Sequence, residues 1–170
     1  MRNSFFPAII SLLFFCTSCN NEKAGTTGGL SATAQKNLDA FHVVSKAFDT
    51  GDISQIDSVV ASDFRDHRPY GDVIGPDSLK AMITMMKNSG TMKSEIKKEL
   101  ADDEYVMAWM RWTGTSNVAM EGMPAGPIDM NGVEVVRFKD GKAVEHWAFM
   151  PPPPPMNASP ATPTSTDKKQ

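Results

Sequence analysis

Glu134 and His146 are the two residues of this sequence whose types and spacing best suit proton-transfer chemistry. They lie in two segments, 129–138 and 142–150, that a Lys-Asp-Gly turn joins into a predicted β-hairpin. Side chains directly opposite each other on such strands have Cβ atoms about 4.5–5.5 Å apart, close enough for a carboxylate and an imidazole to share a hydrogen bond. Such a pair is suited to act as a general base or as a polar anchor for a ligand. The alternative is a structural cross-strand ion pair, worth about 1 kcal/mol or less if it is exposed.

The register of the hairpin decides whether the two side chains meet. A two-residue turn would place Glu134 opposite Trp147, whereas a three-residue loop would place it opposite His146. We favour the three-residue loop because it also pairs Val136 with Val144. A slip of one residue would send every side chain of one strand to the other face of the sheet.

The elements that position this pair follow an order of helices first and strands second. A helix is predicted around 38–48 and ends at Gly51, a second over 53–60 begins with Asp52 as its cap, and a third starts at Pro76. Two further strands are predicted at 94–101 and 105–113, in addition to the hairpin. This order favours an α+β fold, with three N-terminal helices packed on one face of an antiparallel sheet.

Other side chains are weaker candidates for a site. Trp109 and Arg111 share one face of the strand at 105–113, and a lone arginine there needs an acidic partner such as Glu134 or a ligand anion. The three histidines are too far apart for a metal-binding spacing, so we expect no metal and no cofactor.

Composition narrows the class of protein. The chain has 170 residues, 41% apolar and 22% charged, and a net charge of −3, which argues against nucleic acid as a partner. Both cysteines, Cys16 and Cys19, lie near the N-terminus, which excludes a disulfide framework, a zinc cluster and a cysteine nucleophile from the folded body.

The N-terminus has the features of an export signal. A positive start and an apolar run over 5–15 lead to Cys19, which follows two small residues and resembles the lipobox of bacterial lipoproteins. We expect residues 1–18 to be removed and Cys19 to be lipidated, giving an exported, membrane-anchored lipoprotein of the bacterial cell envelope. An ordinary cleaved signal or an uncleaved anchor are the alternatives. We expect a flexible tether over 19–30, one domain over 31–150 and a proline-rich disordered tail over 151–170.

Four stretches resemble the SnoaL-like polyketide cyclase group of the nuclear transport factor 2-like superfamily. They are DFRDHRP (63–69), GPDSLKAM (75–82), WTGTSNVAMEGMPAGP (112–127) and VEVVRFKDGKAVEHW (133–147). The resemblance implies a cone-shaped α+β barrel whose curved sheet encloses a deep, mainly apolar pocket, frequently in a homodimer.

The resemblance also implies roles for single residues. In cyclases of this group, an acid two positions after the histidine of the last strand moves the proton, and the matching position here is Ala148. Glu134 falls at one of the polar positions of the preceding strand, and Asp66 or His67 falls where the family has a pocket-lining polar residue. The predicted pocket therefore comprises the catalytic candidates Glu134 and His146, with lining residues Asp66, His67, Trp109, Arg111 and Ala148.

Three functions are compatible with these features. The first is a lipid-anchored protein that binds a small, mainly apolar ligand in this pocket. The second is a lyase, isomerase or cyclase that uses Glu134 and His146 for proton transfer. The third is a non-enzymatic module that dimerises or binds a partner through an exposed face of the sheet.

Overall fold

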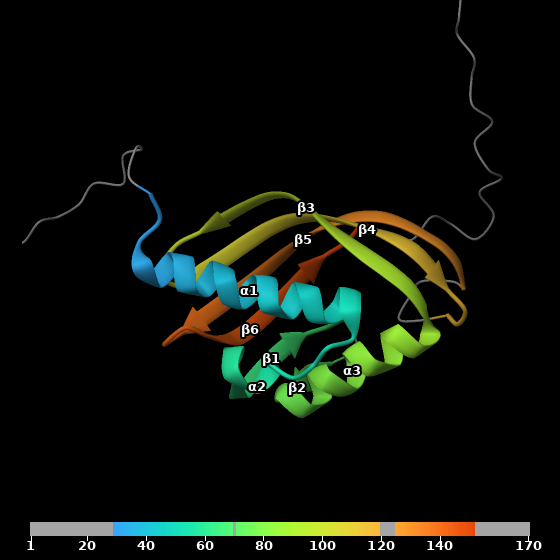
Figure 1. Ribbon diagram of the computed structural model, residues 1–170, viewed down its shortest axis with the longest axis horizontal. Coiled ribbons are helices and arrows are strands. Elements are labelled where there is room, and N and C mark those ends of the chain that lie inside the picture. The colour runs from blue at the N-terminus through green and yellow to red at the C-terminus, as the bar shows by residue number, and fades with distance from the viewer. Residues whose placement is uncertain (1–28, 70, 120–124, 152–170) are drawn as a thin grey trace, which may run out of the picture.

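The computed structural model describes residues 29–69, 71–119 and 125–151. Its elements, in chain order, are α1 (Ala32–Thr50), α2 (Ile56–Val59), β1 (Val60–His67), β2 (Val73–Ile74), α3 (Pro76–Ser89), β3 (Gly90–Ala101), β4 (Tyr105–Ser116), β5 (Gly126–Lys139) and β6 (Lys142–Phe149). The helices lie on one side of a curved sheet that arches over α1 without closing into a complete barrel (Figure 1). The predicted α+β class and its three helices are confirmed.

Helix α1 begins and ends at the residue types that favour such boundaries. The side chain of Ser31 accepts a hydrogen bond from the backbone N–H of Ala34 at 3.0 Å, and Gly51 ends the helix with a φ of 80°. Between these residues, Leu38 and Phe41 are buried against the sheet, which explains the three-residue spacing seen in the sequence. The predicted stop at Gly51 is confirmed.

The second helix differs from the prediction at its start. Asp52 accepts a hydrogen bond from the backbone N–H of Ser54 at 3.0 Å and so forms a turn before the helix. Helix α2 then covers only Ile56–Val59. A short aspartate-led turn and a helix cap use the same local hydrogen bond, so the sequence pattern does not separate them.

The sheet has the strand order β2-β1-β6-β5-β4-β3, and its strands pair antiparallel except β1 with β6. That parallel pairing differs from the antiparallel sheet expected from the sequence. Between β1 and β6 the chain passes through α3 and the antiparallel strands β3–β5, which bring β6 back alongside β1 in the same direction. As a result Asp66 of β1 is the register partner of His146 of β6.

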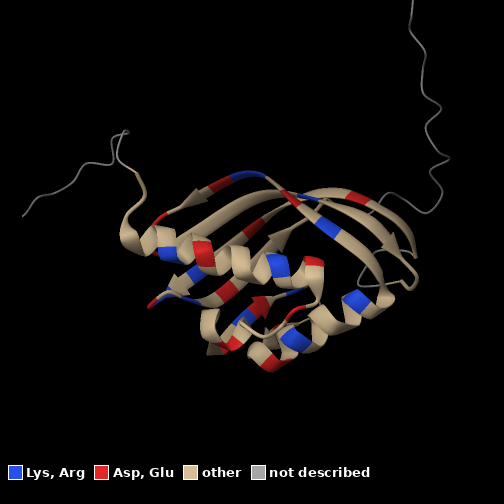
Figure 2. Cartoon of the chain, in the orientation of Figure 1, with Lys and Arg blue, Asp and Glu red and all other residues tan. Residues whose placement is uncertain are grey.

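The core lies between the helices and the concave face of the sheet. Alternate residues of the central strands, such as Ala108 and Met110 of β4, point toward the helices. Leu79 and Ile83 of α3 point toward the sheet and complete this core. The edge strand β3 carries lysines and glutamates along its length (Figure 2), which discourages pairing with another chain.

Several predicted features lie outside the described residues. These are the signal and Cys19, most of the tether, and the tail after residue 151. No helix within the described part of the chain is both long and apolar enough to span a membrane.

Candidate functional site

Glu134 and His146 both lie on the concave face of the sheet, but their register differs from the prediction. The turn is the two-residue one, with positive φ at Asp140 (54°) and Gly141 (75°). A bulge beyond the turn then shifts the pairing, so that Arg137 lies opposite Glu145.

The three-residue loop is therefore wrong, and Glu134 is paired with Ala148 instead of His146. His146 is paired with Val136. The pairing is displaced from the predicted one by two residues, and a shift of two keeps each side chain on its face. Glu134 and His146 are diagonal neighbours, a relation that spans about 7–8 Å and leaves room for an atom between them.

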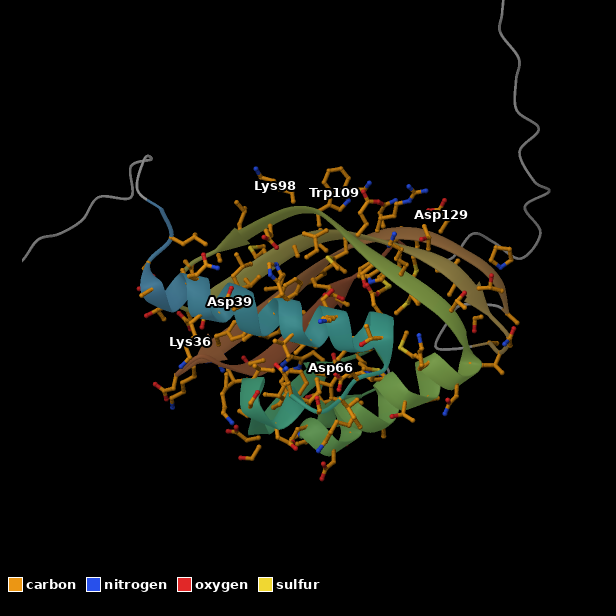
Figure 3. All side chains as sticks on the ribbon, viewed as in Figure 1. Lys36, Asp39, Asp66, Lys98, Trp109 and Asp129 are labelled. Atoms are coloured by element: carbon orange, nitrogen blue, oxygen red, sulfur yellow. The ribbon has the colours of Figure 1, made fainter. Side chains whose placement is uncertain are left out.

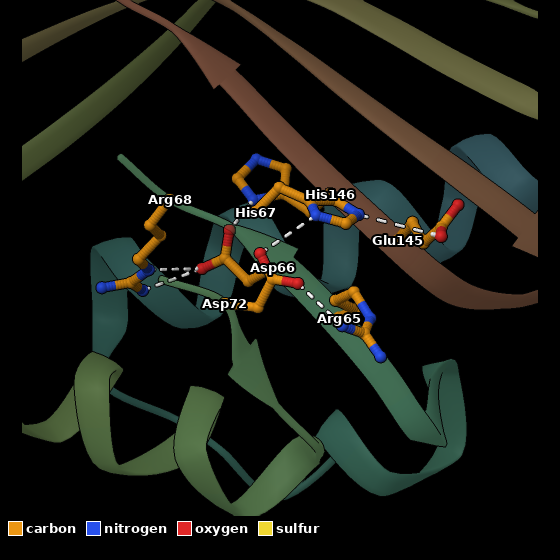
Figure 4. A network of polar contacts seen from close by, with 7 residues as sticks. All are labelled: Arg65, Asp66, His67, Arg68, Asp72, Glu145 and His146. Carbon is orange, nitrogen blue, oxygen red and sulfur yellow. Dashed lines mark hydrogen bonds and ion pairs between the residues drawn. The ribbon is translucent and has the colours of Figure 1, made fainter. Parts of the chain in front are cut away.

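His146 is held by a buried carboxylate. Its Nδ1 lies 2.7 Å from Oδ1 of Asp66, which is only 4% exposed (Figure 4). The guanidinium of Arg68 donates to the other oxygen, Oδ2, of Asp66 at 2.8 Å from both Nε and one terminal nitrogen. One carboxylate oxygen thus orients the imidazole while the other is occupied by a cation. This leaves Nε2 of His146 without a hydrogen-bond partner among the described residues.

Arg68 is a site residue that the sequence analysis missed. It comes two positions after Asp66, directly beyond the end of β1, and also contacts the sulfur of Met82 in α3. The signal that could have found it is the Asp-His-Arg sequence, because residues two apart on an extended segment point to the same side.

Glu134 is half-buried and makes no hydrogen bond within the described parts of the chain. Its neighbours across the sheet are both alanines, Ala108 on β4 and Ala148 on β6. Burial raises the pKa of the Glu134 carboxyl, the positive charge of His146 opposes that rise, and Asp66 adds to it. Both neighbouring side chains end at their Cβ atoms.

The pKa values of His146 and Asp66 are shifted in opposite directions. Burial opposes the charged form of His146, but the hydrogen bond to Asp66 and the charge of Glu134 outweigh it, so the pKa of His146 is raised. Burial likewise opposes the charged form of Asp66, but its bonds to His146 and Arg68 prevail and lower the pKa of this carboxyl. The site therefore favours an imidazolium next to a carboxylate, with a second carboxyl group of raised pKa nearby.

Three of the predicted pocket residues lie on the other face of the sheet. Trp109 is 52% exposed there and points away from the helices (Figure 3). Arg111 forms a two-pronged ion pair with Asp129 at 2.9 Å. Arg111 thus has an acidic partner, but it is not Glu134. The cause is strand alternation, since even-numbered residues of β4 face the core and odd-numbered ones face away.

His67 is the third residue on the outer face. It stacks on Trp147 with ring centroids 4.8 Å apart, and its Nδ1 lies 3.1 Å from Asp72. Its Nε2 is 3.7 Å from Glu145. Asp66 and His67 are consecutive on β1 and therefore point to opposite sides of the sheet. Of these two residues, Asp66 is the one that lies on the concave face with His146.

An open groove of about 330 Å³ lies between α1 and β3. Its lining includes His42, Lys46 and Asp49, and none of the predicted site residues. The ligand space beside Glu134 stays a prediction, supported by the alanines that flank this residue.

The paired charges predict a pH dependence of stability. Because the folded state raises the pKa of His146, its contribution is fully present below about pH 6.5 and is lost as the pH rises through the raised pKa. The raised pKa of Glu134 acts in the same direction, starting from about pH 4.5. We therefore expect the free energy of unfolding, measured in urea, to fall with rising pH above neutrality.

His146→Asn should flatten this fall. His42→Asn, on α1 and outside the site, should leave it in place. A His146→Asn profile with the slope of the unmutated chain would contradict the assignment.

The chain is similar to known proteins in sequence and in fold. A family model described as SnoaL-like domain matches residues 41–146. The SnoaL-like polyketide cyclase candidate from Jannaschia sp. CCS1 is similar in structure, with a TM-score of 0.64 and 15% identity over 73% of this chain and 91% of that one.

Two further structures share the fold. The polyketide cyclase candidate from Bacillus cereus ATCC 10987 has a TM-score of 0.57 and 27% identity over 69% of this chain and 75% of that one. The LEH-like epoxide hydrolase from M. tuberculosis has a TM-score of 0.58 and 12% identity over 69% and 84%. No curated protein matches the chain.

Proposed function

Because the chain belongs to the SnoaL-like domain family, we propose that it binds a small, mainly apolar molecule on the concave face and moves a proton on it with Glu134 and His146. The observation that carries this proposal is the imidazole of His146, held by Asp66 and lying diagonal to a half-buried carboxyl group with a raised pKa. A carboxyl group with a raised pKa and an oriented imidazole are suited to act as a general acid–base couple.

The arrangement suits proton transfer next to a carbonyl group. Glu134 as carboxylate takes the proton from the carbon beside the carbonyl. His146, protonated through its partnership with Asp66, donates a hydrogen bond from Nε2 to the carbonyl oxygen, where negative charge develops. Return of the proton at another carbon gives an isomerase, loss of a leaving group a lyase, and attack of the enol carbon on a second carbonyl a cyclase.

Ala148 does not exclude this chemistry. The resemblance places a catalytic acid at this position in related cyclases, and an alanine cannot carry a proton. Glu134 is the residue directly opposite Ala148 on the neighbouring strand, with an expected Cβ separation of about 4.5–5.5 Å. A carboxyl group can thus occupy the same region from the adjacent strand.

The remaining lining supports an apolar ligand. Met82 of α3 and Met130 of β5 pack against the core from this face without being fully buried, and Trp112 covers Gly132. A Cβ at Gly132 would lie 2.9 Å from Cζ3 of the Trp112 ring, so this glycine allows the close packing of the indole. Flexible methionines at the edge of the core are suited to contact a ligand with little charge.

Ala148→Leu is expected to weaken binding of such a ligand at least tenfold, because its side chain would fill the space beside Glu134. The loss corresponds to about 1.4 kcal/mol. Native mass spectrometry against a panel of small cyclic and aromatic ketones measures the effect. Ala81→Leu, at another exposed alanine on α3, is the matched control. Equal binding by both variants, or no ketone bound by the unmutated chain, would count against the proposed site.

We further propose that the protein is an exported lipoprotein anchored through Cys19. The support is the positive start, the apolar run over 5–15 and the small residues before this cysteine. Stable anchoring requires more than one acyl chain, which the diacylglycerol of a lipidated cysteine supplies.

A further inference from the structure

The open groove between α1 and β3 is separate from the site at Glu134 and His146. Helix α1 lies alongside the edge strand β3 (Figure 1), and the space between them measures about 330 Å³. This volume falls within the range of small-molecule sites, which begins at about 300 Å³. Five of the six residues that line the groove are polar: His42, Ser45, Lys46, Asp49 and Ser94, with Ile96 as the apolar member. Charges and hydrogen bonds would therefore hold a ligand there.

A bulge in β3 shapes one wall of the groove. The pairing with β4 shifts between Ile96 and Lys98, which leaves Lys97 as the extra residue. Without the bulge, strand alternation would turn Lys98 toward the helix and Glu99 away from it. Instead, Oε2 of Glu99 lies 2.8 Å from Nε2 of His42 on α1. Bulges re-aim side chains next to functional sites in this way, and here the bulge fixes an imidazole at the wall of the groove.

Asp49 is a half-buried carboxylate that β3 holds in one orientation. Its Oδ1 accepts two hydrogen bonds from Ser94, one from the backbone N–H at 2.8 Å and one from the hydroxyl at 2.5 Å. Lys87 of α3 bonds the backbone oxygen of Asp49, at 3.1 Å, and not its side chain. Among the described residues, Oδ2 of Asp49 accepts no hydrogen bond. A carboxylate fixed in this way is preorganised to accept a hydrogen bond from a ligand.

Lys46 places a positive charge three residues before Asp49 on the same helix. Residues with this spacing have Cβ atoms about 5–6 Å apart on one face of a helix. Within the described parts of the chain, the ammonium group of Lys46 forms no ion pair, and it acts on Asp52 only through its charge. The groove therefore presents one negative and one positive group that are not paired with each other. Beside them lies Ile96, which packs against the core.

We propose that this groove binds an α-amino acid with an apolar side chain, its ammonium group on Asp49, its carboxylate on Lys46 and its side chain on Ile96. The two charged groups of an α-amino acid are bonded to one carbon atom, so one small molecule can contact both residues at their helical spacing. A zwitterion matches both charges, whereas a simple organic cation or anion would meet one group of its own sign. The proposal does not depend on proton transfer at Glu134.

The test is an NMR titration of the isotope-labelled full chain with leucine, leucinamide and isocaproate. Leucinamide lacks the carboxylate and isocaproate lacks the ammonium group, whereas all three molecules share the apolar side chain. We expect leucine to shift the backbone amide signals of Ser45 and Ser94, which line the groove. Leucine should bind at least about tenfold more tightly than either analogue, because each analogue loses one charged hydrogen bond.

Asp49→Asn and Lys46→Gln each remove one charge and should each weaken leucine binding at least about tenfold. Asparagine keeps an oxygen that can accept the bonds from Ser94, and Lys46 is exposed, so both variants should fold. Asp39→Asn and Lys36→Gln are the matched controls, because both residues lie on α1 and neither lines the groove. We expect these controls to bind leucine as the unmutated chain does.

The proposal is wrong if leucine shifts no groove signal at its limit of solubility, or if either analogue binds as tightly as leucine. Equal binding by Lys46→Gln and Lys36→Gln would also overturn it, even if Asp49→Asn does not fold. Shifts confined to the strands around Glu134 and His146 would place leucine on the concave face. That result would overturn the groove as an amino acid site and leave the proposed proton transfer standing.

Discussion

Glu134→Gln is expected to slow proton exchange on a bound ketone by a factor of about 10²–10⁴, the usual contribution of a positioned general base. Glutamine keeps the shape of the side chain but cannot accept the proton. The exchange of hydrogen for deuterium at the carbon beside the carbonyl, followed by NMR in D₂O, measures the effect without knowledge of the natural product. The fold should survive, because the change removes a carboxyl group whose charge burial disfavours.

Glu145→Gln is the matched control for this experiment. It removes a carboxylate from the neighbouring strand, but from the outer face, where Glu145 bonds Arg137 at 2.6 Å. We expect full exchange activity from this variant. Exchange by Glu134→Gln at the rate of the unmutated chain would end the proposed role of Glu134, and slow exchange in both variants would show that the readout follows stability alone.

Asp66→Asn is expected to lower the free energy of unfolding by about 3 kcal/mol, measured in urea at pH 6. The change leaves Arg68 and His146 without their shared carboxylate at a buried position, and unpaired buried charges carry penalties of this size. The loss should shrink at higher pH, because His146 then releases its proton and only Arg68 remains charged. Ketone exchange should also fall, since the imidazole loses the partner that orients it.

Asp129→Asn shows what an exposed ion pair contributes. Asp129 meets Arg111 with the same two-pronged geometry, but on the outer face and in contact with water. Little change in stability is expected there. If Asp66→Asn unfolds at the same urea concentration as Asp129→Asn and the unmutated chain, the buried ion pairs of Asp66 do not stabilise the fold.

The helices and most strands could be predicted because local rules decide them. Gly51 ends α1 through its positive φ, and Pro76 begins α3 at the first helical position, where its missing N–H costs nothing. An apolar run likewise located β4, and the Lys-Asp-Gly turn located the hairpin strands. Each of these signals acts within a few residues.

The register of the hairpin strands could not be predicted from local sequence rules. The Asp140-Gly141 turn obeys the two-residue rule, but a bulge near Val144 changes the pairing beyond it. Pairing like with like led to the three-residue loop and to an incorrect partner for Glu134. The face assignment was still correct, because the predicted and observed registers differ by an even number of residues.

Alternation and residue type were enough to place Glu134 and His146 on one face of a strand pair, in a chain whose order of elements specified an α+β fold. Tertiary structure alone decided that Asp66 is the partner of His146, that Arg68 neutralises Asp66, and that Trp109, Arg111 and His67 face outward. Trp109 and Arg111 face outward because the odd-numbered residues of β4 lie on the face away from the helices. Asp66 and Arg68 reach His146 because β1 and β6 pair in parallel across 80 residues of sequence. No local propensity encodes such a contact, which forms only when the helices cover the concave face and the last strand completes the sheet.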